Sequence, residues 1–371
     1  MNQSTQQIDA DAPPPDIDGD FAPRLTRALV GHAQPQREFL AALQGGRLPH
    51  AWLLSGPKGI GKASFAYLVA RAVLGHSRPA QITALSPALD GAAAKLIEDS
   101  VHPDLYVLKR SYNEKTDKFR SDISMDETMA MKRSFTLSAA QGGWRVAIID
   151  SIDEMNKAGV NGLLKLIEEP PEKCLFLIIC HHPGRVLDTI RSRCRRLSFN
   201  ALSEAELQQI IADKLDAIDP NEAAAAAFLA DGSVGQALAL AEHGGFDLYR
   251  DMIGVLETLP RLDVERLHGL AGRFGARSAP QSFGLFCHLF SAWLHRVARC
   301  AATGTAFQPV FEGEAELAAR LIGGELPLEP AVALWENTQA EMRRVEALNL
   351  DKKQAVMDWF AGLADGLAKN G

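Results

Sequence analysis

The sequence predicts an α/β domain with a mainly parallel five-stranded sheet, followed by a region made only of helices. Three observations carry this prediction. Short apolar runs alternate with helical patterns from Phe21 to Phe199, a glycine-rich loop follows the first run, and strand signals stop after Phe199. The chain has 371 residues, and at roughly 100–200 residues per domain it should form two or three domains.

The predicted strands are the apolar runs that lie between helical patterns. They are Ala51–Leu54, Leu105–Leu108, Arg145–Asp150, Leu175–Cys180 and Arg196–Phe199. Helices are expected between them, for example over Lys62–Leu74 and Ala158–Glu168. Residues 77–99 are rich in Ala and Pro and residues 109–119 are charged; both lack a clear period and are interpreted as insertions.

Shifts in composition divide the chain into four segments. Their bounds are 1–20, 21–200, 201–243 and 244–371. The first segment holds consecutive prolines among aspartates and is expected to be a disordered tail, because it cannot bury enough apolar surface to order itself. The second is the α/β domain. Ser203 and Glu206 form a capping-box pattern that opens a small helical subdomain, and Gly244 precedes a separate all-α domain.

Composition and charge exclude several classes of protein. Hydrophobic residues make up 47% and charged residues 23% of the chain, close to the averages of folded globular proteins. The net charge of −7 argues against wrapping nucleic acid by bulk electrostatics. The cysteines show no CxxC pair, so reduced thiols and no metal site are expected. No apolar stretch is long enough to span a bilayer, so the expected location is the cytoplasm.

A phosphate-binding loop follows the first predicted strand and opens a helix. Its sequence is Gly56-Pro57-Lys58-Gly59-Ile60-Gly61-Lys62. The glycines Gly56, Gly59 and Gly61 allow backbone N–H groups to converge on phosphate oxygens, and Lys62 is placed to reach the β and γ phosphates. The alternative is a glycine-rich turn with no link to nucleotides, but the strand and helix on either side favour the P-loop.

Two positions of the P-loop chemistry are altered. The residue after Lys62 is normally Ser or Thr, whose hydroxyl coordinates Mg²⁺, and here it is Ala63. The acid at the end of the strand Arg145–Asp150 is present as Asp150 and fits the carboxylate that organises the water shell of the metal. Its neighbour is Ser151, and a serine hydroxyl is a poor general base near neutral pH.

Several further stretches resemble the clamp-loader branch of the AAA+ family of ATPases. They are Leu29-Val30-Gly31-His32, Arg47-Leu48-Pro49-His50-Ala51-Trp52-Leu53, His102-Pro103-Asp104, Asn161-Gly162-Leu163-Leu164-Lys165-Leu166-Ile167-Glu168-Glu169-Pro170-Pro171 and Ser192-Arg193-Cys194. The resemblance covers about residues 25–240. It implies an AAA+ domain, then a helical lid over 201–243 and an oligomerisation collar over 244–371.

The resemblance also assigns roles to single residues. Arg193 matches the family's arginine finger, which acts in trans on the ATP of a neighbouring subunit. His181 stands where active relatives place the sensor-1 Thr or Asn, and Gly235 stands at the position of the sensor-2 arginine. With Ala63 and Ser151, four roles in metal or γ-phosphate chemistry are altered. The resemblance therefore implies a degenerate site that requires no cofactor and that can bind ATP without hydrolysing it.

The expected function is that of a non-hydrolysing clamp-loader subunit, an accessory subunit of a DNA-directed DNA polymerase. By resemblance, its partners are the gamma or tau motor subunits, the delta subunit, the sliding clamp and, through the assembled ring, primed DNA, with no membrane partner. One alternative is an active AAA+ ATPase, either a motor subunit or a helicase-like enzyme. Another is a scaffold that uses bound nucleotide structurally. Ala63 and Ser151 oppose the active enzyme.

Overall fold

The computed structural model describes most of the chain in two units. The described residues are 21–76, 81–85, 91–113, 118–120, 122–136, 143–215, 218–242, 244–275, 280–322, 328–348 and 350–370. The predicted tail, residues 1–20, lies outside them. Contacts divide the chain into Met1–Ala201 and Leu202–Gly371.

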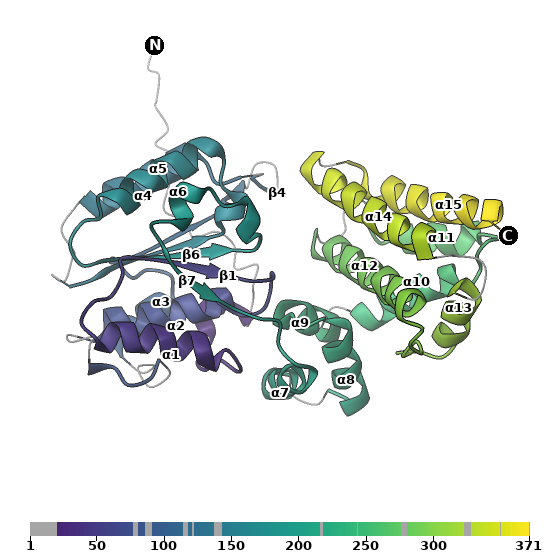
Figure 1. Ribbon diagram of the computed structural model, residues 1–371, viewed down its shortest axis with the longest axis horizontal. Helices are drawn as coiled ribbons and strands as arrows, with labels where there is room; N and C mark the ends of the chain where they lie inside the picture. The colour runs from purple at the N-terminus through teal and green to yellow at the C-terminus, as the bar shows by residue number, and fades with distance from the viewer. Residues whose placement is uncertain are drawn as a thin grey trace, which may run out of the picture. The chain divides into compact units, whose positions relative to one another are not determined.

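The first unit is built on the predicted parallel sheet (Figure 1). Its strands are β1 (Ala51–Ser55), β2 (Leu105–Lys109), β5 (Arg145–Asp150), β6 (Cys174–Cys180) and β7 (Arg195–Ser198), in the order β2-β5-β6-β1-β7. All neighbouring pairs are parallel. Every residue of β1 and β6 is buried, as expected for central strands of a sheet covered on both faces. The predicted fold class is confirmed.

Helices cover both faces of the sheet (Figure 1). One face carries α1 (Ala33–Gln44), α2 (Lys62–Gly75) and α3 (Ala92–Glu98), and the other carries α4 (Met125–Thr136), α5 (Lys157–Glu168) and the short α6 (Asp188–Arg191). Side chains alternate between the two cores along each strand, so Trp52 and Leu54 pack on the α2 side while Ala51 and Leu53 pack on the α5 side. Short 3-10 turns lie at Pro23–Leu25, Ile152–Glu154 and Pro183–Arg185.

The two stretches predicted as insertions contain structure that the sequence did not indicate. Within 77–99, α3 forms and buries Ile97, and Ile82 and Leu85 are buried in the same core. Within 109–119, β3 (Tyr112–Asn113) and β4 (Lys118–Phe119) form a two-stranded antiparallel sheet. The sequence did not indicate α3, because a helix of seven residues is too short to show a clear period. That both stretches are insertions stays a prediction.

The described part of the second unit contains only helices. They are α7 (Glu204–Lys214), α8 (Pro220–Leu229), α9 (Val234–Glu242), α10 (Gly245–Leu256), α11 (Val264–Gly272), α12 (Pro280–Thr303), α13 (Glu314–Arg320), α14 (Leu328–Leu348) and α15 (Lys352–Asn370). Both hydrogen bonds of the predicted capping box join Ser203 and Glu206. The boundary between 243 and 244 stays a prediction. None of the described helices is long and apolar enough to cross a membrane.

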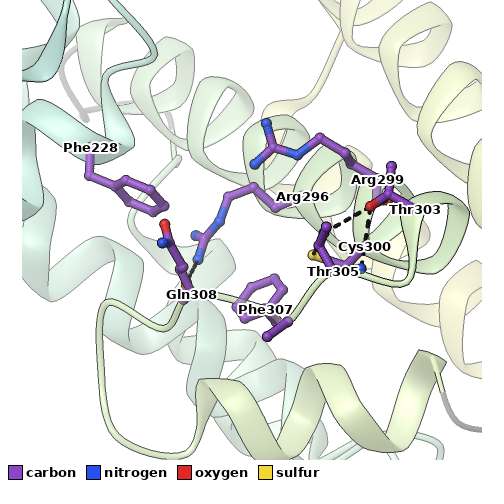
Figure 2. Close-up of a pocket in the computed structure, with 9 residues that line it drawn as sticks. Phe228, Arg296, Arg299, Cys300, Thr303, Thr305, Phe307 and Gln308 are labelled. Carbon is purple, nitrogen blue, oxygen red and sulfur yellow. Dashed lines mark hydrogen bonds between the residues drawn. The ribbon is translucent and has the colours of Figure 1, made fainter.

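A buried ion pair joins the helices of the second unit. The guanidinium of Arg296 donates from Nη1 to Glu314 Oε1 at 3.1 Å and to the Tyr249 hydroxyl at 3.0 Å. Figure 2 shows Arg296 between the rings of Phe228 and Phe307, whose centroids lie 4.8 and 4.4 Å from its Cζ. Glu314 is fully buried, and its Oε2 also accepts from backbone N–H groups. These contacts compensate the buried charges.

Removing Glu314 should destabilise the second unit strongly. Glu314→Ala leaves Arg296 buried without its carboxylate, and breaking such a pair costs about 3–5 kcal/mol. Urea denaturation followed by circular dichroism measures the change in the free energy of unfolding. Glu316→Ala, in the same helix but exposed, is the matched control and should change it by less than about 0.5 kcal/mol. Equal effects of the two variants would contradict the role of the buried pair.

Candidate functional site

The loop between β1 and α2 depends on three glycines. Gly56, Gly59 and Gly61 have φ angles of 153°, 80° and 102°, a region that side chains with a Cβ rarely adopt. A Cβ at Gly56 would also lie 2.2 Å from the carbonyl oxygen of Phe199. The Gly56 N–H donates to the Cys180 oxygen at 3.2 Å, which ties the loop to the end of β6. The loop therefore has the tight backbone path of a phosphate-binding nest.

Lys62 is held at the centre of this loop. Only 3% of the residue is exposed, and its Nζ donates to Gly56 O at 2.7 Å and to Pro57 O. An ammonium group has three N–H donors, so one remains for a phosphate oxygen. Burial lowers the pKa of Lys62 to about 8, and the nearby carboxylate of Asp150 partly offsets this effect. The lysine is therefore still mostly protonated at pH 7.

The two residues after Lys62, Ala63 and Ser64, offer no free hydroxyl for a metal. Ala63 packs against the core on the α2 side of the sheet. Ser64, one residue further along α2, has its Oγ at 2.9 Å from Thr26 Oγ1, which donates to it. P-loop ATPases hold Mg²⁺ through a hydroxyl at the position of Ala63. The side chains after Lys62 do not fit magnesium.

Asp150 and Ser151 lie where β5 ends. Burial raises the pKa of Asp150 to about 6, Glu154 adds to this effect, and the charges of Lys58, Lys109 and Lys62 act against it. Ser151 is 1% exposed. Among the described residues, its hydroxyl has no hydrogen-bond partner. Asp150 thus has the lysines of the loop beside it, and its role towards a metal stays a prediction. Its neighbour Ser151 offers a buried hydroxyl.

His181 follows β6 and is held by an acid that sequence reasoning missed. The carboxylate of Asp153 accepts the backbone N–H of His181 at 2.6 Å and that of His182 at 3.0 Å. Burial lowers the pKa of His181 to about 4, and the charge of Lys62 acts in the same direction. Its Nδ1 has no partner within the described part of the chain. The imidazole is therefore neutral at pH 7.

The motif that contains His32 supports the loop from outside. His32 Nε2 lies 2.7 Å from the carbonyl oxygen of Ile60 in the loop. Its ring meets the ring of Phe199 edge-on, with centroids 5.0 Å apart. This stretch, singled out in the sequence only by resemblance, therefore helps to fix the path of the loop.

Arg193 lies on a separate segment, after α6. Its Nη2 is 2.9 Å from Glu168 Oε1, and its Nη1 donates to the Thr189 oxygen at 3.0 Å. The side chain is 40% exposed. The pairing with Glu168, the last residue of α5, could not be predicted from sequence spacing. Gly235 lies in α9 of the second unit, so its relation to the loop stays a prediction.

The described residues contain no group of three or more His, Cys, Asp or Glu side chains that could hold a metal ion. All five cysteines lie within the described residues, and none of them forms a disulfide. The structure therefore brings together a loop, a lysine, one carboxylate and two neutral polar side chains. They are Gly56, Gly59, Gly61, Lys62, Asp150, Ser151 and His181.

Comparison with known proteins gives one family and several relatives. Residues 31–203 match the family model described as DNA polymerase III, delta subunit. DNA polymerase III subunit delta' from Pseudomonas aeruginosa is 35% identical over 167 residues, which are 43% of this chain and 46% of that protein. The delta' subunit from Yersinia pestis is 31% identical over 160 residues, 43% of this chain and 44% of that protein.

A third relative carries a different subunit name. DNA polymerase III subunit tau from Bacillus subtilis is 29% identical over 224 residues, which are 59% of this chain and 38% of that protein. The chain therefore spans less than half of the length of each of these three relatives.

Replacing His181 should change how stability depends on pH. Below pH 6.5 the unfolded chain protonates this imidazole, whereas the folded chain resists protonation down to about pH 4. The stability that neutral His181 contributes is therefore complete above pH 6.5 and is lost as the pH falls towards 4, by up to about 3 kcal/mol at 1.36 kcal/mol per pH unit. His181→Asn should flatten this part of the curve of unfolding free energy against pH.

Urea denaturation of both proteins at several pH values between 4 and 7.5 measures the difference. Asp150 acts in the opposite direction, because its raised pKa favours the folded state at low pH and this gain is lost as the pH rises through about 6. Asp150 is present in both proteins, so its contribution to the pH dependence of stability cancels in the comparison. A variant that keeps the wild-type slope would contradict the burial of a neutral His181.

Proposed function

We propose that the chain is a delta-prime-type clamp-loader subunit of DNA polymerase III, because residues 31–203 match the family model described above and two relatives are delta' subunits. In this proposal it hydrolyses no ATP itself and supplies Arg193 to the ATP site of a neighbouring motor subunit. The observation that carries it is the combination of an intact loop and Lys62 with a missing magnesium hydroxyl at Ala63.

The proposed lack of hydrolysis follows from what the site residues can do. The loop N–H groups and Lys62 can bind phosphate. Ser151 offers a hydroxyl where AAA+ enzymes use an acid to activate water, and a hydroxyl near neutral pH is a poor base. His181, neutral and fixed beside Asp153, differs from the sensor residue of active relatives. The site can therefore bind without completing the chemistry.

Arg193 has the properties that action in trans requires. Its guanidinium has five donors in a rigid fork, of which Glu168 and Thr189 engage two nitrogens. The exposed part of the side chain leaves donors for a phosphate oxygen outside this chain. Glu168 and the Thr189 oxygen act as positioning groups, because they fix the plane of the guanidinium before a neighbouring subunit arrives.

The proposed partners follow from the resemblance of the sequence to the clamp-loader branch, and the relatives named above are tau and delta' subunits. They are the gamma or tau motor subunits, the delta subunit, the sliding clamp and, through the assembled ring, primed DNA, all in the cytoplasm. The all-α residues 244–371 would form the oligomerisation collar. The two delta' relatives, at 35% and 31% identity, support the delta-prime assignment.

The tau relative favours a second candidate, an active motor subunit, because it matches a larger share of this chain, 59% against 43%. The two candidates differ in the chemistry of the loop. A motor subunit needs a metal ligand after the lysine and a base after Asp150, and Ala63 and Ser151 provide neither. The loop therefore favours the non-hydrolysing subunit.

A steady-state ATPase assay on the purified chain separates the two candidates. We expect no turnover above background, and no change in the Lys62→Ala variant, because Ala63 supplies no hydroxyl for magnesium and Ser151 supplies no base for water. Phosphate release is measured with excess Mg²⁺ and ATP. Turnover that Lys62→Ala abolishes would overturn the non-hydrolysing assignment and favour the motor subunit.

Arg193→Ala should lower the ATPase activity of the reconstituted complex. A finger contributes roughly 10³–10⁵ in rate, so the site that it serves should lose nearly all of its turnover. The measurement is clamp- and DNA-stimulated ATPase of the complex with gamma or tau and delta. Assembly, followed by size-exclusion chromatography, should be unchanged.

Two further variants sharpen this test. Arg191→Ala removes a neighbouring exposed arginine that pairs with Asp188 and should leave the rate unchanged. Glu168→Gln keeps the shape of the positioning group but removes its charge, and should give a smaller loss than Arg193→Ala. Equal rates for Arg193→Ala and the wild type would remove the finger assignment.

A further inference from the structure

We infer that the loop of this chain binds the phosphates of a nucleotide without a divalent cation, and that Lys58 supplies positive charge that Mg²⁺ supplies in active P-loop ATPases. The inference rests on the proposed function only in that it uses the same loop. The inference goes beyond the proposed function, because it specifies a nucleotide without a bound metal ion and names Lys58 as a further binding residue.

The first step is the poor fit of the site to magnesium. The position after Lys62 carries the methyl group of Ala63, and the hydroxyl of Ser64 already accepts a hydrogen bond from Thr26 at 2.9 Å. Magnesium requires near-ideal octahedral coordination by oxygen. The start of α2 offers no hydroxyl oxygen that is free for it.

The second step is the charge around the carboxylates at the end of β5. Glu154 accepts from Arg110 Nε at 3.0 Å and lies 4.0 Å from Lys58 Nζ. Lys109 is the register partner of Asp150 in the neighbouring strand. Both acids therefore have cationic side chains beside them already.

A count of charges shows which ligand suits this cluster. The cations are Lys58, Lys62, Lys109 and Arg110, and the carboxylates are Asp150, Asp153 and Glu154. Four positive charges against three negative charges leave one positive charge in excess. A divalent cation would add to this excess, whereas a polyphosphate would neutralise it.

The third step concerns Ser151, which stands where active AAA+ enzymes carry an acid. An acid at the position of Ser151 would repel a phosphate that has no metal ion to screen it. The hydroxyl of Ser151 is buried and has no hydrogen-bond partner among the described residues, so it can donate instead. The two departures, Ala63 and Ser151, remove a metal ligand and a repulsive charge from the same site.

Lys58 is suited to the role because it lies within the loop itself. Its side chain is 74% exposed, and its contact with Glu154, at 4.0 Å, is loose. Such an exposed ion pair is weak, and Glu154 retains Arg110 if Lys58 leaves. The flexible lysine stem can therefore turn towards bound phosphates.

The experiment is a titration of the full chain with a fluorescent ADP or ATP analogue, once with EDTA and once with excess Mg²⁺. We expect dissociation constants within about twofold of each other, because Ala63 replaces the hydroxyl that would hold the metal and the Asp150 carboxylate already has lysines beside it. Binding that requires Mg²⁺, or no binding under either condition, would overturn the inference. The Arg193→Ala result in the reconstituted complex does not depend on this outcome, so the two proposals can fail separately.

Two lysine variants test whether Lys58 contributes to the binding of the phosphates. In EDTA, Lys58→Ala should weaken binding about three- to tenfold, the effect of one partly exposed charge on a phosphate. Lys95→Ala removes the same charge at an exposed position of α3 and should bind like the wild type. An unchanged affinity of Lys58→Ala, with a wild-type thermal melt, would overturn the role of Lys58.

A gain of metal dependence is the complementary test. Ala63→Ser restores a hydroxyl at the position that holds Mg²⁺ in active P-loop ATPases. This variant should bind the nucleotide more tightly with Mg²⁺ than with EDTA, unlike the wild type. If the variant and the wild type respond to Mg²⁺ in the same way, Ala63 is not the cause of metal independence and the inference fails.

Discussion

The path of the glycine-rich loop between β1 and α2 depends on the close approach of Gly56 to the ends of two neighbouring strands. Its N–H bonds to Cys180 at the end of β6, and the carbonyl oxygen of Phe199 lies where a side chain would begin. The carboxyl ends of parallel strands meet at one edge of a sheet, where ligands bind in open α/β folds. Lys62 then reaches back to the Gly56 carbonyl, so loop, lysine and strand ends are fixed by the same contacts.

The sequence was sufficient to predict the elements that a short stretch of residues specifies by itself. All five strands form within one residue of their predicted bounds. The central strands β1 and β6 are continuous apolar runs, as expected for buried parallel strands. The three glycines were identified because the loop requires unusual φ angles. Helix α3 was not, since its burial depends on Ile97 meeting a core formed by distant segments. No short-range pattern encodes such contacts.

The contacts that define the chemistry of the site were the least predictable. Asp153 holds the backbone of His181 from 28 positions earlier in the chain, and Thr26 engages Ser64 across 38 positions. Residue identity at Ala63 and Ser151 indicated which groups are missing. Only the fold reveals what the remaining acids do: Asp153 is engaged by backbone N–H groups and Glu154 by Arg110. The acids that surround the loop thus serve the protein's own donors.

Solvent exposure explains how Arg193 can pair with Glu168 and still be accessible to a group outside this chain. Its partner Glu168 is 45% exposed and the arginine 40% exposed, and pairs of this kind contribute only about 0–1 kcal/mol. The donors of the guanidinium that Glu168 and Thr189 leave unused therefore stay accessible, whereas the buried Lys62 is tied to the carbonyls of its own loop. In the proposed function, burial keeps Lys62 for a ligand of this chain, and exposure leaves Arg193 accessible to a ligand outside it.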